Sequence, residues 1–281
     1  MEPRAIGRYQ LRESLGAGAM GQVYLAHDPQ LRRDVAVKVV RADLTSPTAS
    51  QRFQREALAW AQVVHPAVVQ VLDSGVAELK SGTHVSYLVL ELVKGETLAA
   101  RIERDGPLPE ATAVGIAAAL ADGLAAAHAA GVLHRDLKPS NVLLEGDRPK
   151  ITDFGLAKLF QAHGQSLTAP EDVVGTPAYM SPEQVRGERL GPTSDVYGLG
   201  AVLYAMLSGK PPHTTKVLGA LFDEIANHAP PALAKLNPSV SAPLNALVAR
   251  CLAKDPARRF PTARALAVAL GNLRAAPAGG G

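Results

Sequence analysis

The chain has 281 residues, which favours a two-lobed arrangement over one small domain. Hydrophobic residues make up 47% and aromatic residues 4%, so the expected core is aliphatic and rich in alanine. The 29 basic and 26 acidic side chains leave a net charge of +3. No basic cluster with interleaved aromatic residues occurs, so nucleic acid is not an expected partner.

Cysteine content and apolar stretches bear on location. Cys251 is the only cysteine, which excludes an internal disulfide, and we expect it to be a small buried hydrophobe.

The first ten residues show no apolar signal-peptide region. The longest apolar stretch, 113–131, is broken by Asp122 and two glycines and predicts a buried helix rather than a membrane span. We expect a cytoplasmic location, and a membrane anchor beyond this chain stays open.

The first ninety residues read mainly as strands. Short β-branched or alternating runs bounded by turn signals predict strands at 9–16, 22–27, 34–40, 68–75 and 85–92. One helical pattern interrupts them at 46–64, with capping residues and Pro47 near its start.

After Gly95 the pattern becomes helical. Helices are predicted at 97–106, 109–131, 193–209, 241–254 and 262–274. The helix at 193–209 is apolar on most sides, which predicts burial. A small sheet with one helix thus precedes a larger helical lobe, with expected domains at 1–92 and 93–274 and a flexible tail or linker at 275–281. Ligands favour the crevice between such lobes.

A glycine-rich stretch, LGAGAMGQVYLA, lies near the N-terminus. Gly16, Gly18 and Gly21 form G-x-G-x-x-G, followed by Val23. The same spacing marks dinucleotide-binding folds, where it lies between a strand and a helix. Here strand patterns lie on both sides, which favours a hairpin whose backbone approaches phosphate oxygens. An ordinary hairpin turn is the alternative.

A lysine within an apolar strand is the second feature. Lys38 ends VAVK, and burial of its charge requires an anion. A nucleotide phosphate and Glu56 on the predicted helix at 46–64 are the two candidates. An exposed lysine on an edge strand is the alternative.

Three further motifs complete a set. HRDLKPSN at 134–141, DFG at 153–155 and SPE at 181–183 follow the glycine loop and VAVK in order. Together they resemble the protein-kinase signature set over residues 9 to about 270. The resemblance implies an α+β, bilobal protein kinase-like fold, with a small antiparallel-sheet N-lobe carrying one main helix and a larger helical C-lobe.

The resemblance also implies catalytic roles. Asp136 would accept or orient the proton of the substrate hydroxyl, and Lys138 would stabilise the moving γ-phosphate. Asn141 and Asp153 would hold Mg²⁺, with Mn²⁺ as an alternative ion. Lys38, oriented by Glu56, would hold the α- and β-phosphates of ATP. The full implied catalytic set is Asp136, Lys138, Lys38 and Glu56.

A nucleotide site is implied as well. Its phosphate side would consist of Gly16, Ala17, Gly18, Gly21, Lys38 and Asp153. Its adenine side would consist of Val23, Ala36, Leu90, Leu143 and the backbone groups of Glu91 and Val93.

Supporting contacts follow from the same resemblance. His134 would pack against Phe154 rather than act as a base, and both would stack with Trp60 and Val71. Asp195 would accept hydrogen bonds from the catalytic-loop backbone. A buried ion pair would join Glu183 to Arg259.

The segment GTPAYMSPE and Lys138 resemble serine/threonine kinases, in particular bacterial Hanks-type enzymes. The implied partners are proteins with serine or threonine acceptors, and a homodimer through the N-lobe stays open. Thr168 and Ser166 are candidate phosphorylation sites that would pair with Arg135. Thr176 would contact Asp136 and Lys138, or itself be modified.

Two other functions are alternatives to an active protein kinase. A pseudokinase scaffold commonly lacks one residue of the catalytic set, and none is missing here. A kinase-fold enzyme for small molecules is disfavoured by GTPAYMSPE, which resembles a docking platform for an extended peptide.

Overall fold

The computed structural model describes residues 5–18, 21–40, 47–79, 82–154 and 177–275. These residues form two compact units. The described part of the first lies within 1–65 and 69–94, and we call it the sheet unit. The described part of the second lies within 66–68, 95–155 and 167–281, and we call it the helical unit.

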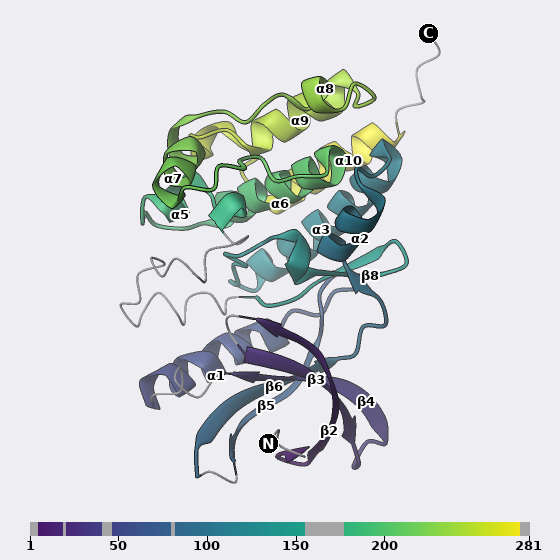
Figure 1. Cartoon of the computed structure of the whole chain (residues 1–281), viewed down its shortest axis with the longest axis vertical. Helices are drawn as coiled ribbons and strands as arrows, with labels where there is room; N and C mark the ends of the chain where they lie inside the picture. The colour runs from purple at the N-terminus through teal and green to yellow at the C-terminus, as the bar shows by residue number, and fades with distance from the viewer. Residues whose placement is uncertain (1–4, 19–20, 41–46, 80–81, 155–176, 276–281) are drawn as a thin grey trace. The chain divides into compact units, whose positions relative to one another are not determined.

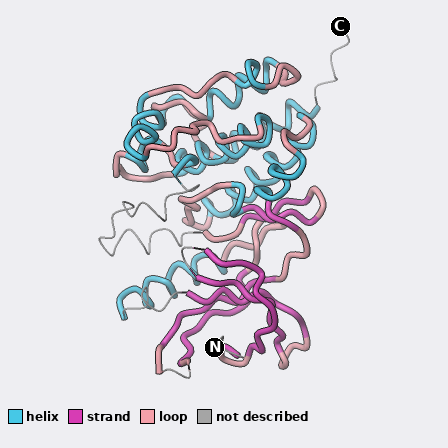
Figure 2. Tube along the Cα trace, viewed as in Figure 1, coloured by secondary structure: helices cyan, strands magenta, loops and turns pink. Residues whose placement is uncertain are grey.

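The sheet unit is a six-stranded sheet with one helix, coloured purple to blue in Figure 1 and shown by type of structure in Figure 2. Its spatial order is β1-β2-β3-β4-β6-β5, and every neighbouring pair is antiparallel. The strands are β1 (Ala5–Ile6), β2 (Tyr9–Gly18), β3 (Gly21–Asp28), β4 (Arg33–Val40), β5 (Val71–Glu78) and β6 (His84–Glu91), and the helix is α1 (Pro47–Ala61). The expected antiparallel sheet with one main helix is confirmed.

The two faces of this sheet differ in chemistry. Residues directly opposite each other on antiparallel strands share a face. β4 pairs Lys38 with Val23 on one side and Leu88 on the other, so these three share a face with Ala36, two residues away. The opposite face holds a core of apolar side chains: Ile6, Tyr9, Ala26, Val35, Val37, Val85, Tyr87 and Val89.

The helical unit is built around two long helices. α3 (Glu110–Ala129) and α6 (Pro192–Ser208) are both largely apolar, and α6 ends at Gly209 in the left-handed conformation. The other helices are α2 (Leu98–Asp105), α5 (Pro182–Val185), α7 (Leu218–Asn227), α8 (Leu233–Leu236), α9 (Ala242–Cys251) and α10 (Ala263–Ala275). Together with the sheet unit, they confirm the expected α+β class.

Among the described residues, α3 alone is long and apolar enough to cross a membrane, with a mean hydropathy of 1.4. It packs against α6 and α10, and 56% of its most apolar window is buried inside the protein. These contacts agree with the predicted buried helix. Cys251 on α9 is also buried, as predicted, and burial raises the pKa of its thiol to about 12.

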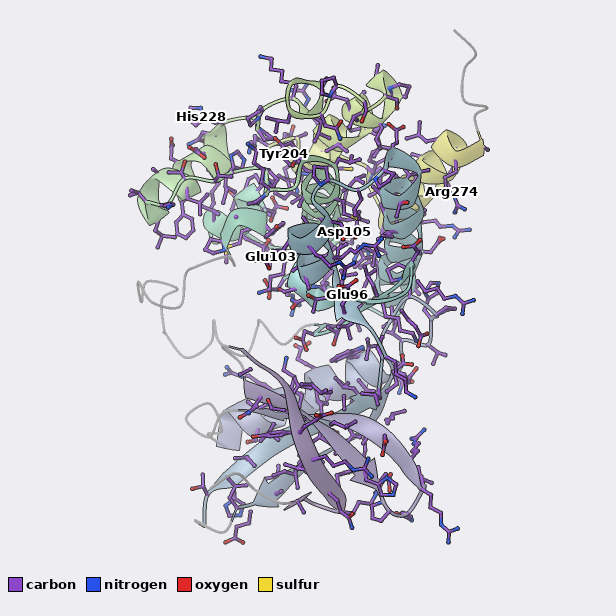
Figure 3. All side chains as sticks on the ribbon, turned by 45° about the vertical axis from the view of Figure 1, so that its right-hand side comes forward. Glu96, Glu103, Asp105, Tyr204, His228 and Arg274 are labelled. Carbon is purple, nitrogen blue, oxygen red and sulfur yellow. The ribbon has the colours of Figure 1, made fainter. Side chains whose placement is uncertain are left out.

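The surface of the helical unit carries both charged and uncharged side chains. Figure 3 labels several of them, and Glu103, His228 and Arg274 are exposed. Tyr204 is instead buried, and its hydroxyl donates to the carbonyl of Pro231 at 2.9 Å.

Several elements were not predicted. A small sheet of β7 (Glu96–Thr97), β8 (Val142–Glu145) and β9 (Arg148–Ile151) lies in the helical unit, and its strands are too short to give a period-two signal. α7 was also missed. Its buried residues Leu221 and Ile225 lie four apart, a spacing that could have indicated a helix.

Candidate active site

The segment His134–Asn141 joins α3 to β8. Gly131 follows α3 with φ +75°, and a 3-10 helix (Pro139–Asn141) leads directly into β8. The proline is at the first position of this helix, where its missing N–H leaves no intrahelical bond unmade. The polar residues between Gly131 and Pro139 therefore form a loop with a fixed entry and exit.

Asp136 and Lys138 form the charged centre of this loop. The Nζ of Lys138 lies 2.8 Å from Oδ2 of Asp136, and their side chains are 16% and 14% exposed. Asn141 also contacts Asp136, because its Nδ2 donates to the Asp136 carbonyl at 2.8 Å and to Oδ2 at 3.2 Å. The structure thus brings together the three loop residues predicted to act in catalysis and metal binding.

His134 has a structural role here. It is fully buried, its Nε2 lies 2.8 Å from the carbonyl of Thr152, and its Nδ1 accepts the Asp136 N–H at 3.2 Å. Its ring meets that of Phe154 edge-on, with 4.8 Å between centroids. This contact confirms the predicted packing against Phe154. Both ring nitrogens also have hydrogen-bond partners, with the proton on Nε2. Trp60 and Val71 belong to the sheet unit, so the predicted four-residue stack stays a prediction.

Asp195, in the first turn of α6, anchors the loop backbone. Its carboxylate accepts the N–H groups of His134 and Arg135, each at 2.9 Å. Its Oδ2 also lies 2.7 Å from Nε2 of His128. Burial alone would raise the pKa of this carboxyl, but the His128 bond and the backbone donors hold it below its usual range. The predicted acceptor role of Asp195 is confirmed.

Two residues of this region have left-handed backbones without being glycine. Arg135 and Asp153 both have φ +67°. Each such conformation costs about 1–3 kcal/mol and persists only where surrounding contacts impose it. Such residues concentrate at functional sites, which supports placing the chemistry here.

The oxygen donors fit a hard divalent cation. Both side-chain hydrogen bonds given above for Asn141 are donated by Nδ2, so its Oδ1 is presented as an acceptor. The Thr152 N–H donates to the Asn141 carbonyl at 3.0 Å, which ties the segment before Asp153 to the loop. An amide oxygen and a carboxylate are ligand types that Mg²⁺ accepts.

The glycine loop is a hairpin, as the sequence predicts. Gly16 pairs with Val23 and Gly18 with Gly21 across β2 and β3. Gly21 has φ +146°, and a Cβ there would lie 1.9 Å from the carbonyl of Val39, so the fold itself requires glycine. Gly16 and Gly18 differ, because among the described residues nothing would lie within 4 Å of a Cβ on either. The described part of the fold therefore does not itself require glycine at those two positions.

Lys38 lies in the middle of β4 and is 6% exposed. Because β4 lies between β3 and β6, this position excludes the alternative of an exposed lysine on an edge strand. Ala17 pairs with Gln22 next to the turn, Ala36 pairs with Leu90, and Glu56 lies on α1, partly buried.

The remaining predicted adenine residues divide between the units. The Glu91 N–H donates to the carbonyl of Gln70 at 3.0 Å, so this amide already has an acceptor within the sheet unit. Val93 follows β6 and is partly buried. Leu143 lies in β8 of the helical unit, where it pairs with Lys150. Ser166, Thr168 and Thr176 lie outside the described residues.

The predicted ion pair of Glu183 and Arg259 is confirmed. Arg259 is 1% exposed, and its guanidinium binds the carboxylate with two bonds of 2.6 and 2.9 Å. Its other donors reach the carbonyls of Ala253, Thr193 and Lys254. Burial tends to raise the pKa of the Glu183 carboxyl, but the Arg259 and Ser194 bonds bring it below its usual range.

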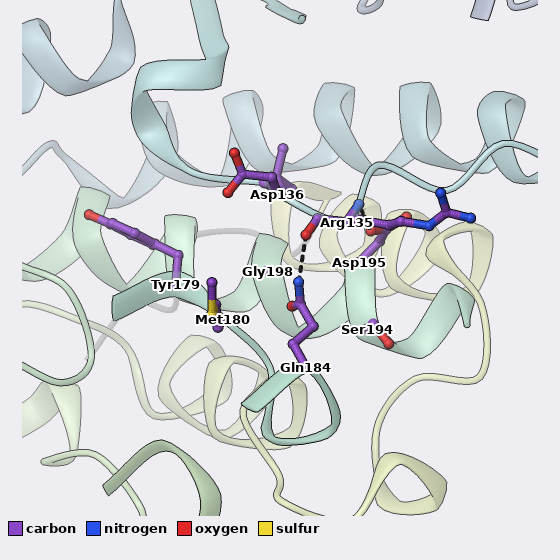
Figure 4. A pocket seen from close by; sticks show the side chains of 9 residues that line it. Arg135, Asp136, Tyr179, Met180, Gln184, Ser194, Asp195 and Gly198 are labelled. Atoms are coloured by element: carbon purple, nitrogen blue, oxygen red, sulfur yellow. Dashed lines mark hydrogen bonds between the residues drawn. The ribbon is translucent and has the colours of Figure 1, made fainter. Parts of the chain in front are cut away.

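A small pocket beside Asp136 contains a residue that the sequence did not single out (Figure 4). It lies between the catalytic loop and the start of α6, and Tyr179, Met180 and Gln184 form its other side. The Nε2 of Gln184 donates to the Arg135 carbonyl at 2.5 Å. Gln184 directly follows the SPE motif, and this position is the one sequence signal that could have identified Gln184 as part of the site.

Comparison with known proteins agrees with this geometry. The protein kinase domain family matches residues 9–269. Serine/threonine-protein kinase PknB of Mycolicibacterium smegmatis is 42% identical over 258 residues, which cover 91% of this chain and 41% of that protein. A probable serine/threonine-protein kinase of Streptomyces coelicolor, SCO3848, is 37% identical over 93% of this chain and 39% of its own length.

A solved structure is also similar. The kinase domain of PknI from Mycobacterium tuberculosis, in a mutant form, superposes with a TM-score of 0.75 at 29% identity, covering 97% of each chain. The chain spans about two fifths of the length of the curated PknB relatives it matches, 41% in the first case. By its motifs, its fold and these matches, the chain belongs to the protein kinase domain family and is a homologue of bacterial serine/threonine-protein kinases.

Proposed function

We propose that this kinase domain transfers the γ-phosphate of ATP to serine and threonine hydroxyls of proteins. The observation that carries the proposal is the Asp136–Lys138 pair at 2.8 Å. The substrate oxygen forms a new bond to the γ-phosphorus while the bond from that phosphorus to the β–γ bridging oxygen breaks and ADP leaves. The hydroxyl proton passes to Asp136, and Lys138 stabilises charge on the transferred group.

Membership of the family implies use of ATP and a divalent metal in general terms. We propose Mg²⁺ as the ion, held by Asn141 and Asp153, with Mn²⁺ as a substitute. Bound there, Mg²⁺ would neutralise phosphate charge as the transfer proceeds. The chain's own contribution is to present the Asn141 oxygen, because Asp136 engages the amide nitrogen.

For the nucleotide we propose the set named from the sequence. Gly16, Ala17, Gly18 and Gly21 would cover the phosphates, and Lys38, oriented by Glu56, would bind them. Support comes from the burial of Lys38 and from the open space above Gly16 and Gly18. For the adenine we propose contact with Val23, Ala36, Leu90, Glu91, Val93 and Leu143.

The remaining proposals concern organisation and regulation. We propose lobes at 1–92 and 93–274, a cytoplasmic location for this domain, and phosphorylation of Thr168 or Ser166, which lie in the sequence between Asp153 and Glu183. Thr176 would shape the site that binds the substrate hydroxyl.

A homodimer through the N-lobe would give a doubled mass in analytical ultracentrifugation. Point mutations in the sheet unit would then reduce the fraction of dimer.

The testing experiment is incubation of the purified chain with γ-labelled ATP and Mg²⁺, with and without a generic basic protein substrate. We expect label on serine and threonine of the added protein, and mass spectrometry should locate phosphate on the chain itself. The matched control is Asp136→Asn, which keeps the size of the side chain and one acceptor oxygen but cannot take the proton. It should abolish transfer while ATP binding and the melting temperature stay near those of the wild type.

Binding of ATP without transfer by the wild-type chain would favour the scaffold function instead. Near-wild-type turnover in Asp136→Asn would remove Asp136 from its role. Label on small-molecule hydroxyls but on no protein would contradict the proposed substrate class.

A further inference from the structure

Gln184 connects two segments through one side-chain amide (Figure 4). Its Nε2 donates to the Arg135 carbonyl at 2.5 Å. Its Oε1 accepts the Ser181 N–H at 2.9 Å and the Ser181 hydroxyl at 3.1 Å. Ser181 is the N-cap of α5, so this glutamine closes a capping box and also reaches 49 residues back to the catalytic loop.

The peptide group that precedes Asp136 is held at both of its polar atoms by side chains. Its carbonyl, that of Arg135, accepts the Gln184 bond, and its N–H donates to His134 Nδ1 at 3.2 Å. Asp195 holds the preceding N–H, that of Arg135. Residues 132–138 belong to no helix or strand, so no ladder of backbone hydrogen bonds supports them, and Arg135 has φ +67°. Lys138 and Asn141 contact the Asp136 carboxylate itself, and these few bonds set the peptide plane from which its side chain extends.

We propose that Gln184 is a positioning residue for phosphoryl transfer, acting on Asp136 through the Arg135 carbonyl. The inference rests on the proposed function. A freed carbonyl would let the peptide plane turn, and the Asp136 carboxylate would lose its orientation toward the substrate hydroxyl. Gln184 needs both halves of its amide for this role, since the nitrogen holds the loop and the oxygen holds the α5 cap.

The first test removes both halves of the amide while keeping the length of the side chain. Gln184→Met is compared with wild type and with Gln30→Met, a matched control at an exposed turn between β3 and β4. We expect kcat to fall about tenfold, the effect of one lost hydrogen bond on a transition state. The KM for ATP should stay within about twofold, since Gln184 holds Asp136 and not the nucleotide. An unchanged kcat would overturn the proposal.

The second test removes only the donor. Gln184→Glu keeps an acceptor for Ser181 but places a carboxylate oxygen against the Arg135 carbonyl. A protonated carboxyl can donate again, so the ratio of its kcat to that of wild type should rise as the pH falls from about 8 to about 5.5. Gln184→Met offers no proton, and its ratio should stay flat. A role confined to the stability of α5 would give parallel profiles for both variants, which would contradict positioning.

A third measurement needs no turnover. Hydrogen–deuterium exchange of peptides that cover 132–138 should be faster in Gln184→Met than in Gln30→Met. If the wild type transfers no phosphate, the proposed function fails, while this exchange still decides whether Gln184 holds the loop. If Gln184→Met does not fold, exchange and turnover in Gln184→Glu across pH decide instead. Equal exchange in all variants would overturn the proposal.

Discussion

In the sheet unit most candidate functional residues are placed by backbone pairing, whereas the loop around Asp136 in the helical unit is held by side chains from distant parts of the chain. Lys38 lies in β4 between β3 and β6, opposite Val23 and Leu88. The loop around Asp136 is instead held by Asp195, 60 residues beyond Arg135, and by Gln184.

This difference has a consequence for mutation. A ladder of backbone hydrogen bonds survives a change of side chain, so a functional residue on a strand can be altered without moving its neighbours. A loop held by side chains loses its shape when one of them is removed, because a buried group then lacks its partner. Function and stability should therefore separate in the sheet unit, whereas in the helical unit they should couple at the residues that hold the loop, Asp195 and Gln184.

The largest expected effect is on turnover in Lys38→Met. Loss of the buried cation that we propose binds the ATP phosphates should lower kcat/KM about a thousandfold, while the sheet keeps its pairing. Phosphate transfer and thermal unfolding measured on the same preparation check this. A large fall in melting temperature would show that the sheet unit depends on this side chain after all.

The largest effect on stability is expected for Arg259→Met in the helical unit. The variant leaves the Glu183 carboxylate buried without its guanidinium, and breaking such a pair costs about 3–5 kcal/mol. Denaturant unfolding measures the change, with Arg264→Met as a control, because Arg264 binds Asp122 at the surface. Equal unfolding free energies for the two variants would contradict the prediction that the buried ion pair stabilises the helical unit more than the surface pair does.

A smaller effect concerns pH and His213, which is 5% exposed in the helical unit. Its Nε2 lies 3.4 Å from Nζ of Lys254 and its Nδ1 lies 3.5 Å from Glu224. Burial first, and then Lys254, lower the pKa of His213 from 6.5 to about 4.

The unfolded chain therefore takes up this proton first as the pH falls, and the free energy of unfolding should decrease between pH 6.5 and about 4. His213→Phe removes the titration and should reduce that decrease by about 1–3 kcal/mol. Denaturant unfolding of wild type and of His213→Phe, measured from pH 6.5 to about 4, checks this prediction. The same change of unfolding free energy with pH in both proteins would contradict it.

The smallest effects separate two glycines of the hairpin. Gly21→Ala should destabilise the sheet unit by about 1–3 kcal/mol, because both φ and the Val39 carbonyl oppose a side chain. Gly18→Ala should change stability by less than about 0.5 kcal/mol and instead raise the KM for ATP. Thermal unfolding and steady-state kinetics distinguish the two. An unchanged KM in Gly18→Ala would remove the phosphate role of that position.

Much of the fold was predictable because local signals were strong. Alternating strands, the hairpin at Gly18 and Gly21, and helices closed by Gly131 and Gly209 all follow from spacing and from residue conformational preferences. The packing of His134 on Phe154 and the pair of Glu183 with Arg259 were predicted from the resemblance to protein kinases. The short strands β7–β9 and α7 were not predicted.

The sequence by itself determined which residues are the candidates for the chemistry, since the motifs contain an acid, cations and oxygen ligands in the order of the kinase family. It also determined where regular elements form, because periodicity is local. Only the tertiary structure decided how Asp136 is held. The bonds from Asp195 and Gln184 join segments far apart in the chain, and they hold Arg135 in its left-handed conformation. No local sequence pattern encodes such contacts.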